Sequence, residues 1–263
     1  MSKKMLKIAS FNCNSINLRL PHIKMLFNDG VDVVCLQETK VRDSAFPIFE
    51  VENIGYNHII FSGEATGQRG VAVLSKYPIK ETSRLNIVDS GKRHIAFEIE
   101  GITVHNFYIP AGGDLPDVSV NQKFDEKLRF LDWTIDYFSK IKQKTIILGD
   151  FNIAPFEKDV HDHKRLLKVV SHSPIEIEIM AKWVQSGDFV DITREFIDKS
   201  LPCYTWWSYR IPDAYGKGYG RRLDHIWCTK DIWHCAKSVD ILHHYRSTER
   251  PSDHVPVVCG FEF

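Results

Sequence analysis

Short apolar runs alternate with polar stretches along most of the chain. Many of these runs are rich in β-branched residues and are bounded by Gly, Pro, Asn or Asp, which is typical of buried strands. Two of them, 94–99 and 102–109, flank Glu100-Gly101 and are expected to pair as a hairpin. We predict strands over residues 6–11, 31–36, 56–61, 71–74, 94–99, 102–109, 146–148, 222–227, 239–242 and 255–263.

Other segments show helical spacing. The clearest is 121–141, where apolar residues recur at steps of four and three and form a single stripe. Ser173 and Glu176 flank Pro174 in the pattern of a capping box, so we expect a helix from there to about Gln185. Further helices are predicted over residues 18–27, 46–54 and 159–170.

The order of these elements indicates the fold class. Strands do not alternate strictly with helices, which argues against a doubly wound parallel sheet. No internal repeat, low-complexity segment or linker divides the chain. We therefore expect residues 1–263 to form a single α+β domain built on two packed, mostly antiparallel sheets.

Composition places few further limits on function. Hydrophobic residues make up 43% of the chain and charged residues 26%, as in ordinary globular proteins. No apolar run reaches the length of a membrane span, and the N-terminus, Met1 to Met5, lacks the apolar segment of a signal peptide. We expect a cytoplasmic protein with no membrane partner. Because the formal net charge is zero, a nucleic acid would have to be held by a local basic patch.

The cysteines are dispersed and never form a C-x-x-C pair. Most lie in strand-like apolar runs, which favours reduced core residues over disulfides or a zinc site. Cys13 lies between Asn12 and Asn14, and the alternation of a strand should turn it into the core. The six positions are Cys13, Cys35, Cys203, Cys228, Cys235 and Cys259.

Candidate chemistry begins in the middle of the chain, at Asp150 and Asn152. Both follow the apolar run Ile146 to Leu148, and residues two apart on an extended chain point to the same side. Alone, this pair could equally be a polar turn after a strand. Polar residues recur, however, at the edges of other core strands. The full set is Asn12, Asn14, Glu38, Tyr108, Asp150, Asn152, Asp224, Asp253 and His254.

If these strand ends converge, the chemistry is well defined. Carboxylates and amides without sulfur ligands suit a hard cation, Mg²⁺ or Mn²⁺. A single His beside carboxylates suits base catalysis or stabilisation of a transition state. Together the residue types predict metal-assisted hydrolysis of a phosphodiester.

Six motifs in order resemble those of the exonuclease III family of abasic-site endonucleases, within the wider endonuclease/exonuclease/phosphatase group. The resemblance runs from about Leu6 to the end of the chain and implies a four-layer α/β-sandwich, two sheets flanked by helices. The motifs are Ser10–Asn14, Leu36–Lys40, Tyr108–Pro110, Gly149–Pro155, Arg222–His225 and Ser252–His254.

The resemblance implies roles for the metal and the attacking water. Glu38 matches the principal metal-binding carboxylate, while Asn14 and Asp253 match further positions at or near the metal. Asp150 matches the residue that orients or deprotonates the water. Of the two candidate bases, Asp150 and His254, we favour Asp150.

Further roles concern the phosphate. By resemblance, Asn152 and Asn12 position Asp150 and the phosphate, and Tyr108 places a phenol near the scissile bond. His254 with Asp224 matches a His–carboxylate pair, in which the carboxylate favours the imidazolium and the imidazolium stabilises charge on the phosphoryl oxygens.

The loop over residues 206–222 interleaves aromatic and basic residues. Basic groups can hold phosphates while aromatic rings stack or fill a gap in a duplex. The alternative is core aromatics beside a solvated loop. By resemblance, two of its residues form walls of a pocket for a flipped-out, base-free sugar, namely Trp206 and Leu223. The predicted substrate contacts are Trp206, Arg210, Arg221, Arg222, Leu223 and Lys40.

Some positions depart from the family pattern. Arg221 stands where relatives often carry Trp or Leu, and Ala111 to Gly113 replace a segment that often has Asn or Gln after the Pro. Gly218 and Ser208 replace a frequent Asn and a frequent Asp. These differences leave the metal and water residues intact but affect the shape of the pocket.

The function implied is magnesium-dependent incision of double-stranded DNA 5′ to abasic sites, leaving a 3′-hydroxyl. Exonuclease activity from 3′ to 5′ is expected as well, 3′-phosphatase activity is left open, and a monomer is expected. Two alternatives remain. One is a phosphodiesterase or phosphatase of the same group acting on a non-DNA substrate such as a phospholipid. The other is an inactive DNA-binding module.

Overall fold

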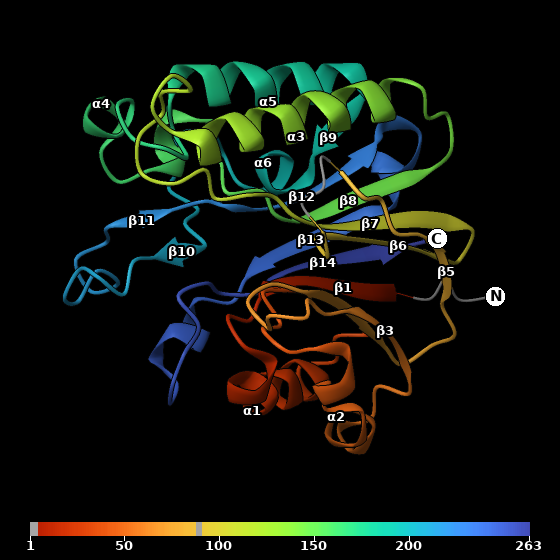
Figure 1. Cartoon of the computed structure of the whole chain (residues 1–263). Helices are drawn as coiled ribbons and strands as arrows, with labels where there is room; N and C mark the ends of the chain where they lie inside the picture. The colour runs from red at the N-terminus through yellow and green to blue at the C-terminus, as the bar shows by residue number, and fades with distance from the viewer. Residues whose placement is uncertain (1–4, 88–90) are drawn as a thin grey trace.

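Two six-stranded sheets pack face to face at the centre of the molecule, and helices cover their outer faces (Figure 1). This computed structural model describes residues 5–87 and 91–263; the expectation about the N-terminal segment concerns residues 1–4, which lie outside that part. Within the described ranges, no helix is long and apolar enough to cross a membrane. The predicted four-layer α/β-sandwich is confirmed.

The first sheet is antiparallel except for one parallel pair, β1 with β2. Its last strand in sequence, β14, lies beside its first, β1, so the two ends of the chain meet in one sheet. In spatial order, its strands are β13 (Ala236–Ile241), β14 (Val257–Glu262), β1 (Met5–Asn12), β2 (Val33–Gln37), β4 (Val71–Ser75) and β3 (His58–Ser62).

The second sheet also contains one parallel pair, β7 with β8. The hairpin expected over Glu100-Gly101 is present as β6 and β7. In spatial order, the strands are β5 (Lys80–Ser83), β6 (His94–Ile99), β7 (Ile102–Tyr108), β8 (Thr145–Asp150), β12 (Asp224–Thr229) and β9 (Phe189–Asp191). A separate short ribbon joins β10 (Trp206–Trp207) to β11 (Gly220–Arg221).

Helices α1 (Ile16–Asn28) and α2 (Ile48–Ile54) cover the first sheet. On the second sheet α3 (Gln122–Ser139) packs beside α5 (Pro174–Ser186), with the short α4 (His163–Leu166) and α6 (Ile192–Phe196) nearby. The capping box predicted at Ser173 and Glu176 is present. Short 3₁₀ helices span Asp43–Ala45, Glu157–Asp159, Lys230–Cys235 and His243–Ser247.

Three apolar layers hold this arrangement together. Between the sheets, residues such as Ile8, Phe97 and Ile146 form the central core. Two outer cores lie beneath the helices, one around Leu26 and one around Trp183. All six cysteines are buried and free, as expected.

One predicted element is wrong. A helix was expected over residues 159–170, but the structure has only a 3₁₀ turn that ends at Asp159 and the one-turn helix α4. Asp159 turns inward and bonds two arginines, and Val160 forms a β-bridge with Arg221. These long-range contacts hold the backbone out of a helix. The helix restarts only where the Asp162 side chain accepts a bond from Arg165 N.

Candidate active site

Polar residues from six segments meet where strands of the two sheets end. β1, β2, β7 and β8 finish at this edge, while β12 and the segment before β14 run the other way and begin here. Just past three of these ends, Asn14, Glu38 and Asn152 have left-handed φ angles of 44°, 50° and 55°. Non-glycine residues in this conformation are uncommon and cluster at functional sites.

Asp150 is almost completely buried and accepts three hydrogen bonds. Asn12 Nδ2 donates to its Oδ2 at 2.8 Å, and Asn152 donates from its backbone N to Oδ1 at 2.9 Å and from its Nδ2 to Oδ2 at 3.1 Å. The Nε2 atom of His254 lies 3.8 Å from Asp150 Oδ2. The two asparagines therefore fix the carboxylate in one orientation facing the imidazole.

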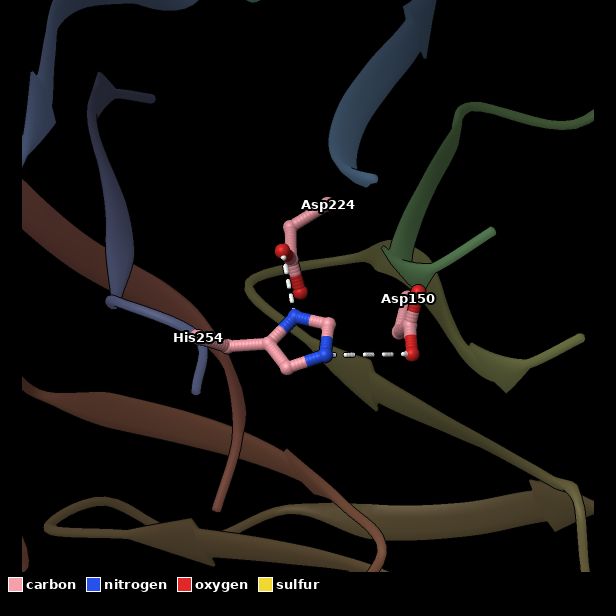
Figure 2. A group of neighbouring side chains, drawn as sticks. All are labelled: Asp150, Asp224 and His254. Carbon is pink, nitrogen blue, oxygen red and sulfur yellow. Dashed lines mark hydrogen bonds and ion pairs between the residues drawn. The ribbon is translucent and has the colours of Figure 1, made fainter. Parts of the chain in front are cut away.

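His254 lies between two carboxylates. Figure 2 shows its Nδ1 directed toward Asp224 and its Nε2 toward Asp150. The distance from Nδ1 to Asp224 Oδ2 is 2.8 Å, and Ser252 Oγ accepts a bond from the His254 backbone N. This arrangement holds the ring in place at both its backbone and its side chain.

The environment shifts the pKa of both partners. Burial raises the pKa of Asp150 to about 7, although the nearby His254 opposes the shift. Burial acts on the pKa of His254 in the opposite direction, but the charges of Asp224 and Asp150 outweigh it and raise this pKa to about 10. At neutral pH the imidazole of His254 therefore carries its proton.

Asn12 links Glu38 to Asp150 by hydrogen bonds to both carboxylates. The Asn12 amide donates to Glu38 Oε1 at 3.0 Å as well as to Asp150, and the Tyr108 hydroxyl donates to the same Glu38 oxygen at 2.8 Å. Lys40 Nζ lies 2.9 Å from Glu38 Oε2. Burial would raise the pKa of Glu38, but Lys40 and these hydrogen bonds outweigh it and lower the pKa.

Further hydrogen bonds lead from Lys40 through Asn14 and Asp253 to Trp206. The Lys40 ammonium also donates to Asn14 Oδ1, and Asn14 Nδ2 donates to Asp253 Oδ1 at 2.8 Å. Trp206 Nε1 donates to the other Asp253 oxygen at 3.0 Å. The polar cluster is thus connected to the indole ring of Trp206.

Two groups of side chains could hold a divalent metal. The first is Asp150, Asp224 and His254, whose ligand atoms all lie within 4.8 Å of one another. In this group Nδ1 of His254 is already bonded to Asp224 Oδ2, so the ring would offer only Nε2 to an ion.

The second group is Glu38, Asn14 and Asp253, which offers oxygen ligands only. Here the Lys40 ammonium already bridges oxygens of Glu38 and Asn14, so the structure places a cation at this point. Oxygen ligands around a cation fit Mg²⁺ or Mn²⁺.

A cavity of about 500 Å³ opens beside the cluster. Glu38, Tyr108, Asn152 and His254 reach its surface from the polar side. The cavity is also lined by Val170, Ser171, Trp206, Arg221 and Leu223, and its exposed rim carries Tyr209, Arg210 and Ile211.

The predicted substrate contacts are only partly placed at this cavity. Trp206, Arg210, Arg221 and Leu223 line it, whereas Lys40 binds Glu38 and Asn14. Arg222 is fully buried, and its guanidinium bonds Asp159 and Asp191. The prediction that Arg222 contacts the substrate is therefore wrong, because strand alternation turns it away from Arg221 and into the core.

Arg93 contacts the site residue Tyr108 but carries no sequence pattern that would have predicted this. Its guanidinium carbon lies 4.6 Å from the centre of the Tyr108 ring, and its Nη1 donates to Tyr108 O at 3.1 Å. Arg93 immediately precedes β6 and does not follow an apolar strand as the predicted site residues do. Only its pairing partner in the sheet reveals the contact, since Tyr108 N bonds back to Arg93 O.

Residues 9–254 match the Endonuclease/Exonuclease/phosphatase family. The chain belongs to this family. It is 30% identical to exodeoxyribonuclease III of Haemophilus influenzae, over 98% of this chain and 100% of that protein. Among solved structures, it is similar to an AP endonuclease from Archaeoglobus fulgidus, with a TM-score of 0.90, 32% identity, and coverage of 98% of this chain and 100% of that one.

A further similar structure is that of the 3′ phosphatase NExo from Neisseria bound to a product DNA hairpin. It aligns with a TM-score of 0.86 and 28% identity, over 98% of this chain and 100% of that one. The chain is thus a homologue of exonuclease III and AP endonucleases over nearly its full length.

Proposed function

We propose that this protein is a magnesium-dependent DNA-repair phosphodiesterase that incises double-stranded DNA 5′ to abasic sites and leaves a 3′-hydroxyl. The observation that carries the proposal is the chain of contacts from Glu38 through Asn12 to Asp150, His254 and Asp224, beside a cavity with an aromatic wall. We propose that residues 1–263 act as one catalytic domain.

In this mechanism Asp150 receives a proton from the attacking water. A base is most effective when its pKa is near the working pH, and the pKa of about 7 for Asp150 meets that condition. Asn12 and Asn152 keep the acceptor oxygen directed to the same point throughout.

His254 and Tyr108 serve the phosphate. The protonated imidazole offsets the negative charge that accumulates on the phosphoryl oxygens in the transition state. Asp224 keeps the ring protonated and aligned, and the Tyr108 hydroxyl, which donates to Glu38 here, would turn from that oxygen to donate to the phosphate.

Glu38 would be the principal ligand of a bound Mg²⁺ or Mn²⁺, assisted by Asn14 and Asp253. When bound, such an ion supplies a Lewis acid for the phosphoryl and leaving oxygens. The ion would displace the Lys40 ammonium from Glu38, and Lys40 would then stay close to the phosphates of the bound DNA.

Trp206 and Leu223 would form the walls that receive the base-free sugar. Arg210 on the rim would contact the backbone of double-stranded DNA. Because relatives are named for exodeoxyribonuclease III, AP endonuclease and 3′ phosphatase, we propose that the same site also removes nucleotides and phosphate from 3′ ends.

The test uses a duplex with a single tetrahydrofuran analogue of an abasic site and a second duplex with a recessed 3′ end, each in Mg²⁺ and in EDTA. We expect Mg²⁺-dependent incision 5′ to the analogue and shortening of the recessed strand, with both lost in EDTA. Shortening without incision would restrict the protein to 3′ ends, and no cleavage of either duplex would overturn the proposal.

A further inference from the structure

Arg221 lines the cavity with a positive charge that no carboxylate neutralises. Among the described residues, no Asp or Glu lies within ion-pair distance of its guanidinium. Nη1 donates instead to two uncharged acceptors, Val170 O at 3.1 Å and Ser171 Oγ at 2.6 Å. Its guanidinium carbon lies 5.3 Å from the centre of the Trp206 ring, and its Nε is buried without a partner.

The charge of the neighbouring Arg222, by contrast, is balanced by carboxylates. Arg222 is fully buried and makes two hydrogen bonds to each of two carboxylates, Asp159 and Asp191. The two residues point to opposite sides of the same backbone. The counter-charges of Arg222 stand on the core side, whereas Arg221, on the cavity side, has no carboxylate within ion-pair distance in the described part of the chain.

Burial lowers the pKa of Arg221, since the charged form loses its hydration, and Glu176 is the one carboxylate whose charge acts in the other direction. Glu176 is already occupied, because its oxygens accept bonds from Lys127 Nζ, Ser171 N and Ser173. A poorly hydrated charge without a counter-ion is costly. An anion entering the cavity would remove that cost.

We propose that Arg221 makes an anion-binding subsite in the cavity, which selects a base-free sugar remnant bearing a carboxylate or phosphate group over a neutral one. The inference rests on the proposed function and specifies its substrate. Because Nη1 is bonded to Val170 and Ser171 and Nε is buried, the anion would accept its hydrogen bonds from the remaining Nη2 amino group. Arg221 is held in place for this by Ser171 and by the face of Trp206.

This subsite is separate from the place where the scissile phosphate would be handled. Within the described ranges, no hydrogen bond or ion pair joins Arg221 to Glu38, Asp150 or His254. Trp206 lies at the boundary, since its Nε1 bonds Asp253 while Arg221 covers its ring. A substrate would therefore need two groups, the phosphodiester at one side and an anion on the sugar side.

The test compares three nicked duplexes that carry the same two-carbon remnant on a 3′-phosphate. The remnant ends in a carboxylate (3′-phosphoglycolate), in a phosphate, or in a neutral hydroxyl. We expect the wild-type protein to remove the charged remnants with the higher kcat/KM. Arg221→Met should lower the charged-to-neutral ratio at least tenfold, and Arg221→Lys should retain part of the preference. The two charged arms show which anion the subsite prefers.

Arg210→Met is the matched control, because Arg210 is an exposed arginine on the rim of the same cavity. It should change all three rates by a similar factor. An Arg221→Met variant that slows all three remnants equally would overturn the subsite.

A binding measurement separates this inference from the proposed function. Wild type and Arg221→Met are titrated calorimetrically with 2-phosphoglycolate and with 2-hydroxyethyl phosphate. We expect Arg221→Met to weaken binding of the first at least tenfold more than binding of the second. If no duplex is cleaved but this difference appears, the proposed function fails and the subsite stands. Equal effects on both ligands would overturn the subsite regardless of cleavage.

Discussion

The position of His254 between two carboxylates decides where the site holds its proton. The ring is buried, which alone would favour its neutral form, yet Asp224 and Asp150 raise its pKa to about 10. Burial also raises the pKa of Asp150, to about 7. The pair is therefore poised with a charged imidazole and a carboxylate that can take up a proton near neutral pH.

We expect a bell-shaped dependence of kcat/KM on pH. Activity should rise through about pH 7 as Asp150 loses its proton and fall toward pH 10 as His254 loses its own. Because the Asp224 charge raises the pKa of His254, Asp224→Asn should move the alkaline limb to lower pH. Steady-state incision at saturating Mg²⁺ measures both limbs. An alkaline limb that stays in place in Asp224→Asn would show that another group controls it.

In the proposed mechanism Glu38 is the principal ligand of the metal ion. Glu38→Gln keeps the shape of the side chain but removes the negative charge that a cation needs, so the half-saturating Mg²⁺ concentration should rise by about 10- to 100-fold. A Mg²⁺ titration of the incision rate checks this, with the exposed Glu178→Gln on α5 as the control. An unchanged Mg²⁺ requirement in Glu38→Gln would move the ion to another set of ligands.

At the scale of the element, short turns at strand ends assemble the site. Asn14, Glu38 and Asn152 adopt left-handed conformations directly after β1, β2 and β8. Each such residue costs on the order of 1–2 kcal/mol, although Asn tolerates it better. The strands before these turns are buried, and the packing of the two sheets offsets the energy cost of the strained residues.

A buried ion network connects the loop after β8 to the start of β12. Asp159 bonds both Arg194 and Arg222, and Arg222 also bonds Asp191. The Arg222 backbone N donates to Asp159 O as well. This network fixes the segment next to Arg221 and Leu223, which stand in the wall of the cavity.

Asp159→Asn should therefore destabilise the protein by about 3–5 kcal/mol, because it leaves two buried guanidinium groups without their shared counter-charge. Urea denaturation followed by circular dichroism measures the loss. Asp125→Asn, which breaks the exposed pair with Arg129, should cost less than about 0.5 kcal/mol. A similar loss of unfolding free energy in the two variants would show that the buried network stabilises the protein no more than an exposed ion pair does.

At the scale of the whole molecule, much of the fold could be predicted from local patterns. The hairpin at Glu100-Gly101, the capped helix from Pro174 and most core strands show clear periodicity or end signals. The candidate site residues could be collected because acids and amides recur at strand ends. Their convergence followed from the resemblance and from the packing of two sheets whose strands end at one edge.

The remaining features depend on contacts between distant segments. Arg222 sits in a basic loop by sequence, but Asp159 and Asp191 draw it into the core. The same contact removes the helix expected from residue 159. Arg93 reaches the site only through the pairing of β6 with β7. The polar strand β5 has no apolar pattern of its own and forms because it adds to the edge of β6.

In the proposed mechanism Asp150 acts in the chemical step and contributes little to DNA binding. The most direct measurement is single-turnover incision of the tetrahydrofuran duplex by Asp150→Asn, with the duplex affinity measured in parallel and the exposed Asp136→Asn as control. We predict incision slower by about 10²- to 10⁴-fold, with affinity for the abasic duplex nearly unchanged. Incision close to the wild-type rate, or a loss of affinity as large as the loss of rate, would contradict the account.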